Sequence, residues 1–159
     1  MLKEIENYLS FLNDLRNQVK TLLEGLPKEA LDWRPLDGQG ELATNSLAVM
    51  TIHLAGSEAF WMKEIIGGQS IHRERDAEFI VKGLEFPELI AKLETAAKDT
   101  PSILSSLPPA QLEETRKFRD RMVTVRWAIL HVIEHWAIHV GHMQLTRQLW
   151  LAKFGKKKD

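Results

Sequence analysis

A group of histidines near the C-terminal end of the chain is the first feature that could carry out chemistry. Within the segment HVIEHWAIHVGH they recur at spacings of four, four and three residues: His131, His135, His139 and His142. In an α-helix, at about 100° per residue, these side chains share one narrow face. Residues four apart have Cβ atoms about 6 Å apart, so two neutral imidazoles can converge on one ion. The spacing indicates a candidate metal site.

A third ligand for such a site has to come from another segment. Zinc and similar metals favour nitrogen ligands, and a catalytic site usually combines three protein ligands with an open position. His53 is the only histidine in the second predicted helix, and it lies in a run of apolar and small residues, VMTIHLAG. Packing of this helix against the last one could bring His53 opposite His135 and His139.

These residues also allow other interpretations. A single histidine on an apolar helix is often a hydrogen-bonded core residue, and four clustered histidines can be half-exposed or form a pH-sensitive patch. Glu58 points about 140° away from His53 on its helix, and Glu134 points about 100° away from His135. Neither is assigned as a general base. Spacing alone leaves the function undecided and the catalytic residues unknown.

Helices are expected to position the histidines, because apolar residues recur at spacings of three and four in four long segments. Asn45–Ser46 and Thr124 are expected to cap the second and last helices, and Pro87 suits the first turn of the third. A short helical turn is expected around residues 28–32. The apolar positions run over Ile5–Leu22, Val49–Ile65, Leu89–Leu107 and Val125–Phe154. Pro101 either kinks or ends the third helix, and a kink is favoured because the apolar phase continues after it.

The segments between these helices complete the expected architecture. The charged stretch Gln69–Glu85 is long enough to cross from one end of a bundle to the other. Residues 110–122 are polar and are expected to be extended or irregular. No segment shows sustained alternation of apolar and polar residues, so strands are not expected. The prediction is an all-α protein, a four-helix bundle that forms one domain over residues 1–159.

Composition excludes several classes of function. The 159 residues are 44% hydrophobic and carry 21 Lys and Arg against 22 Asp and Glu, so no basic excess favours a nucleic-acid partner. No signal peptide and no apolar run of membrane-spanning length is found, and a cytoplasmic protein without a membrane partner is expected. The chain has no cysteine, so any thiol in its chemistry must come from outside.

Three motifs, in order along the chain, resemble the DinB/YfiT-like superfamily of metal-binding four-helix bundles. They are LDWRP at 31–35, NSLAVMTIHLAGSEAFW at 45–61 and HVIEHWAIHVGH at 131–142. The resemblance covers nearly the whole chain and implies a long crossover after the second helix. It implies that His53, His135 and His139 are the metal ligands. His131 and His142 then lie behind the ligands or line the pocket, and His142 stands where many members carry glutamine.

The same resemblance implies a function. A divalent metal, zinc or nickel, would activate a thiol or water, and the thiol would be a low-molecular-weight compound. The protein would be a thiol-dependent transferase or a hydrolase that acts on a small-molecule substrate, and homodimers are common in such proteins. The alternative is a non-catalytic dimeric module that binds a metal or another ligand.

Overall fold

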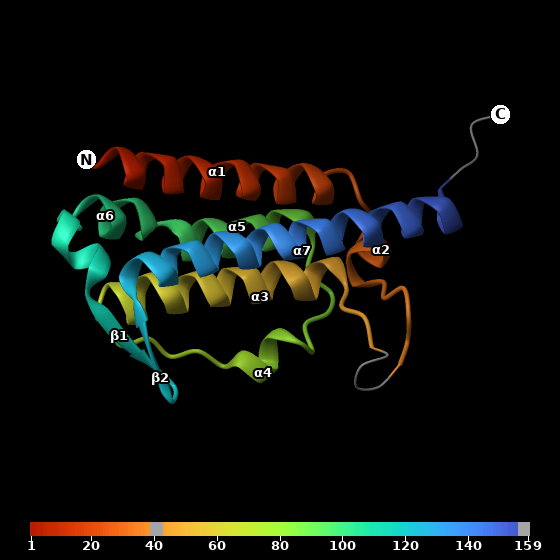
Figure 1. The fold of residues 1–159 in the computed structure, drawn as a ribbon. Coiled ribbons are helices and arrows are strands. Elements are labelled where there is room, and N and C mark those ends of the chain that lie inside the picture. Colours follow the sequence, from red (N-terminus) through yellow and green to blue (C-terminus); the bar gives the residue numbers. More distant parts are fainter. Residues whose placement is uncertain (39–42, 156–159) are drawn as a thin grey trace.

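Long helices lie side by side in the computed structural model, which describes residues 1–38 and 43–155 (Figure 1). Helix α1 packs against α7, and α3 packs against both α5 and α7. This arrangement confirms the predicted all-α fold with a crossover after the second long helix. The long elements are α1 (Lys3–Leu23), α3 (Leu47–Ala59) with its π-helical continuation η2 (Phe60–Ile66), α5 (Phe86–Ala97) with α6 (Thr100–Ser105), and α7 (Val125–Phe154).

Side-chain caps fix the start of both helices that carry the candidate ligands. The Ser46 hydroxyl accepts a hydrogen bond from the backbone N–H of Val49 at 3.2 Å, and the Thr124 hydroxyl accepts one from that of Trp127 at 3.1 Å. Each bond satisfies one of the N–H groups that the first turn of a helix leaves without a partner. The predicted starts of the second and last helices are therefore confirmed.

The core between the helices is filled by large apolar side chains at the periodic positions. Leu12 of α1, Leu54 of α3, Leu89 of α5 and Ile129 and Trp136 of α7 are almost completely buried. Helix α1 buries one stripe and exposes the opposite one, whereas α3 has no exposed residue along its length. The short helix α2 (Lys28–Asp32) precedes α3, at the position where a helical turn is expected from the sequence.

The third long helix differs from the prediction of one kinked helix. Helix α5 ends at Ala97, and α6 begins at Thr100 with Pro101 in its first turn. Proline is favoured there because its missing N–H would have no intrahelical partner anyway. Leu104 nevertheless remains buried, so the interruption preserves the apolar phase that had favoured a kink.

A β-hairpin contradicts the expectation that the chain has no strands. Strand β1 (Thr115–Phe118) pairs antiparallel with β2 (Arg121–Thr124), and the 3₁₀-helix η3 (Pro109–Glu113) precedes them. Each strand has only four residues, too few for alternation to be recognised, and the turn contains no glycine. Arg119 instead adopts a φ of 56° there, a conformation uncommon for residues with a side chain.

The crossover passes over α3 and contains the short helix α4 (Arg75–Glu78), which contacts α3 (Figure 1). The hairpin contacts η2 at one end of the crossover's path, where Phe118 of β1 lies 4.4 Å from Trp61 between ring centroids. These two irregular segments therefore flank the helix that carries His53. Within residues 1–38 and 43–155, no helix is both long and apolar enough to cross a membrane.

Candidate metal centre

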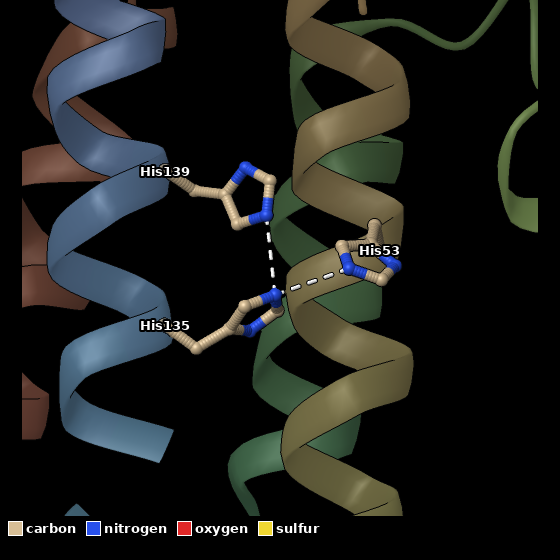
Figure 2. Close-up of side chains that lie close together, drawn as sticks. All are labelled: His53, His135 and His139. Atoms are coloured by element: carbon tan, nitrogen blue, oxygen red, sulfur yellow. Dashed lines mark hydrogen bonds between the residues drawn. The ribbon is translucent and has the colours of Figure 1, made fainter. Parts of the chain in front are cut away.

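Three histidine side chains from two helices point toward one another between α3 and α7 (Figure 2). Nε2 of His135 lies 3.1 Å from Nε2 of His53 and 3.1 Å from Nε2 of His139. One nitrogen from each residue lies within 4.8 Å of the other two. The structure thus brings together the three histidines named from the sequence. That they bind a metal stays a prediction.

Two of the three separations between these nitrogens fit a tetrahedral divalent ion. Zinc–imidazole bonds are about 2.0–2.1 Å long, so two nitrogens on a tetrahedral ion lie about 3.3 Å apart. The observed separations of 3.1 Å from His135 to each neighbour are close to this value. Three imidazoles leave the fourth position of a tetrahedral site for a substrate, as in catalytic zinc sites.

Burial keeps these imidazoles in the neutral form that binds metals. It lowers the pKa of His135 to about 3 and that of His139 to about 4, and neighbouring histidines act in the same direction. The pKa of His53 is also lowered, because burial outweighs its hydrogen bond to Glu78. At neutral pH all three rings therefore carry a lone pair for an ion.

A carboxylate that the sequence analysis missed holds the ring of His53. Nδ1 of His53 lies 2.8 Å from Oε2 of Glu78, and Arg73 donates to both oxygens of the same carboxylate at 2.7 and 2.9 Å. A proton on Nδ1 leaves the Nε2 lone pair free to face the other histidines. The only signal for Glu78 was its position between the apolar Ala77 and Phe79 in an otherwise charged segment.

The other two histidines of α7 lie at either end of the cluster. His131 stacks on Trp127, with ring centroids 4.9 Å apart and ring planes 10° apart, and its ring centroid is 6.1 Å from that of His135. His142 lies 5.8 Å from His139 between ring centroids. Neither belongs to the group whose nitrogens converge, and the role that each plays in the site stays a prediction.

The two carboxylates considered as general bases do not reach the centre. The buried carboxylate of Glu58 pairs with Arg16 and accepts a hydrogen bond from Thr100 at 2.7 Å. It therefore ties α1 to the start of α6. The side chain of Glu134 is 67% exposed, and its carboxylate lies 3.6 Å from Nδ1 of His131.

Two cavities reach the histidines from different ends of α7. The larger, of about 810 Å³, extends along the C-terminal half of α7 and is mainly apolar, with His139 and His142 in its wall. The smaller, of about 560 Å³, lies toward the N-terminal half and includes His53, His131 and His135. Both volumes lie in the range of small-molecule sites, so two compounds could approach the centre at once.

Known crystal structures share the fold of this chain. Three of them are each 20% or less identical to it. A conserved protein of Enterococcus faecalis has a TM-score of 0.75 at 15% identity, covering 96% of this chain and 99% of its own. A DinB-like protein of Bacillus subtilis has 0.66 at 20% identity, covering 96% and 94%. A DinB-like protein of Bacillus cereus has 0.68 at 14% identity, covering 90% of each chain.

A sequence-based comparison extends this likeness. No protein with a curated function matches the chain significantly. The family model of mycothiol-S-transferases, in contrast, matches residues 7–151. That range contains all three converging histidines. The chain therefore belongs to the mycothiol-S-transferase family, within the DinB-like superfamily.

Proposed function

We propose that this protein is a metal-dependent transferase that joins an external low-molecular-weight thiol to a small electrophile. The observation that carries the proposal is the convergence of three neutral imidazoles at a point that two cavities reach. A divalent ion held there, zinc or nickel, would lower the pKa of a bound thiol toward neutrality. Because the chain lacks cysteine, the nucleophilic sulfur belongs to the co-substrate.

The residues of the chain have separable roles in this proposal. His53, His135 and His139 hold the ion, and Glu78 keeps the proton on Nδ1 of His53. Arg73 in turn fixes the carboxylate of Glu78. None of these groups needs to transfer a proton to the substrate, because the lowered pKa that a bound ion would give the thiol would let solvent take the proton.

The larger cavity supports an apolar electrophile as the second substrate. Its wall includes Trp33, Met50, Leu145 and Leu149, and His139 lies at the side of the metal centre. Such a surface gains free energy by removing apolar area from water, at about 25 cal/mol per Å². An electrophile bound there would lie beside His139, one of the three proposed ligands.

Metal content and turnover test the proposal together. Mass spectrometry of untagged protein should find about one zinc or nickel ion per chain, lost in His53→Ala and kept in His72→Ala, whose side chain is 88% exposed. Metal-loaded protein should accelerate the reaction of mycothiol or another thiol with monochlorobimane. A wild type that takes up neither zinc nor nickel would overturn the proposal and favour a non-catalytic module.

We further propose that two copies associate through the exposed face of α7. Ile138 and Leu145 are 50% and 55% exposed on this face, and a Cβ added at Gly141 between them would meet nothing within 4 Å. A two-fold axis near Gly141 would pair Ile138 of one copy with Leu145 of the other, as a self-complementary contact requires. Because Leu145 also lines the larger cavity, the second copy would then cover that part of the cavity wall. We place this dimer in the cytoplasm, where low-molecular-weight thiols are kept reduced.

A further inference from the structure

The smaller cavity beside the histidine centre is strongly cationic. Arg73 and Arg75 of the crossover line one part of it, and Lys117 and Arg119 of the hairpin line another. Among the residues that the structure describes, Glu64 is the only acidic one in its wall. Two segments that lie far apart in the sequence therefore direct their cations into one space, which also contains His53 and His135.

Most of this positive charge is not neutralised by the protein. Arg73 is paired with Glu78. Within the part of the chain that the structure describes, Arg75, Lys117 and Arg119 have no carboxylate within 4.0 Å. Cations that line a cavity without acidic partners create a positive potential, which raises the local concentration of anions.

Aromatic rings hold two of these cations in place. The guanidinium of Arg75 lies 5.0 Å from the ring centroid of Phe79, and that of Arg119 lies 5.2 Å from that of Phe118. A guanidinium on an aromatic face keeps its N–H donors free at its edge. Such donors bind carboxylates and phosphates through paired hydrogen bonds.

We propose that this cavity binds a carboxylate- or phosphate-bearing group of a small molecule whose reactive end reaches the histidine centre. Arg75, Lys117 and Arg119 recognise the anion, while Trp61 and Phe60 supply the apolar part of the wall. This proposal rests on the proposed transferase function, because the anionic group belongs to either the thiol or the electrophile. It divides the site into an apolar side at His139 and a cationic, anion-binding side at His53.

Binding of a simple dianion tests the anion-binding side of the site without any need to measure a reaction. Isothermal titration calorimetry at low ionic strength would compare succinate with its neutral analogue succinamide, on the full chain without metal and with added zinc. Succinate should bind at least tenfold more tightly than succinamide, and about 150 mM salt should weaken it. The double variant Arg75→Ala, Lys117→Ala should lose this preference.

A matched variant controls for net charge. The double variant Lys92→Ala, Lys98→Ala removes two cations at exposed positions in α5 and at its C-terminal end, outside the cavity wall, and should bind succinate as the wild type does. Equal affinity for succinate and succinamide, or an equal loss of succinate affinity in this control and in the cavity variant, would overturn the anion-binding site. Circular dichroism of each variant would establish that the exposed substitutions leave the fold intact.

Kinetics then identify which substrate carries the anion. With zinc-loaded protein, mercaptosuccinate would be compared with 2-mercaptoethanol as the thiol, and 4-chloro-3,5-dinitrobenzoate with 1-chloro-2,4-dinitrobenzene as the electrophile. In each reaction a carbon–sulfur bond forms, chloride leaves and the thiol proton passes to solvent. The anionic partner should show a KM raised about tenfold in the cavity variant. If succinate binding depends on Arg75 and Lys117 but no thiol transfer is detected, the anion-binding site is upheld and only the proposed transferase activity is overturned.

Discussion

Nδ1 of His53 lies 2.8 Å from the carboxylate of Glu78, a residue 25 positions further along the chain. The bond joins α3 to the crossover, and Arg73 holds the same carboxylate from the other side. A carboxylate behind a metal-binding histidine fixes the orientation of the ring and raises its basicity. The crossover is therefore part of the site, although none of the three converging histidines lies on it.

Replacing Glu78 by glutamine should weaken metal binding about 10- to 100-fold, the usual effect of losing a group that orients a ligand. The amide keeps the shape of the side chain but removes the charge that pairs with Arg73 and polarises the imidazole. Competition with a fluorescent zinc chelator would measure the affinity. Glu74→Gln, at an exposed position of the same segment, should leave it unchanged. Equal affinities for the two variants would mean that Glu78 has only a structural role.

The absence of a side chain at Gly56 makes room for the carboxylate of Glu78. Alanine at this position should therefore disturb the proposed metal centre through Glu78, without contacting the three histidines. A Cβ at Gly56 would lie 2.9 Å from Cδ of Glu78 and 3.2 Å from Nε of Arg73, closer than side chains normally pack. We expect Gly56→Ala to weaken zinc binding through displacement of the carboxylate. Because both changes act on one group, Gly56→Ala and Glu78→Gln should be less than additive in a double-mutant cycle. Strict additivity would contradict this route.

The metal-free protein should become less stable in acid because of its buried histidines. Folding lowers the pKa of His135 to about 3 and that of His139 to about 4, whereas an unfolded histidine titrates near 6.5. Below pH 6.5 the unfolded state binds more protons, so the free energy of unfolding falls as the pH drops from about 6.5 toward 4. Partial exposure to solvent reduces the effect to about 1 kcal/mol for each histidine at pH 5.

Urea denaturation in the presence of a chelator, at pH 7 and pH 5, would measure this loss. The double variant His135→Gln, His139→Gln removes both titrating groups and should lose less stability between the two pH values than the wild type. The same loss in both proteins would assign the acid sensitivity to other residues.

The exposed face of α7 gives a separate prediction about assembly. A glutamate at Ile138 would place a charge in the proposed two-fold contact, where its desolvation and repulsion from its symmetry mate disfavour association. Sedimentation velocity should find a dimer for the wild type and a monomer for Ile138→Glu. Phe11→Glu, which changes a 58% exposed side chain of α1, should remain dimeric. A monomeric wild type at micromolar concentration would contradict the proposed dimer.

Local rules explain how much of this molecule was predictable. Apolar periodicity and the caps Ser46 and Thr124 depend on residues a few positions apart, and the helices they predicted are present. The hairpin is stabilised by contacts such as that between Phe118 and Trp61, which join segments more than 50 residues apart. Its four-residue strands carry too little alternation to be recognised without those contacts.

The candidate site shows the same division. Helical phase places all four histidines of α7 on one face, but it does not say which of them lie at the height of His53. That depends on how far α3 is shifted along α7, which is set by packing, so resemblance rather than phase selected His135 and His139. Glu78 was missed because its burial depends on the docking of the crossover against Gly56.

Leu149 tests the apolar side of the site. Its side chain lines the larger cavity and is 42% exposed, so a bound electrophile would cover it. Leu149→Gln keeps the size but adds an amide that must lose water when the substrate binds. We expect the KM for an apolar electrophile such as 1-chloro-2,4-dinitrobenzene to rise about five- to tenfold, with the KM for the thiol unchanged. Leu130→Gln, at a side chain of α7 that is 47% exposed and outside the cavity wall, serves as the control. If both variants behave alike, or if the thiol KM changes instead, the electrophile does not occupy this cavity.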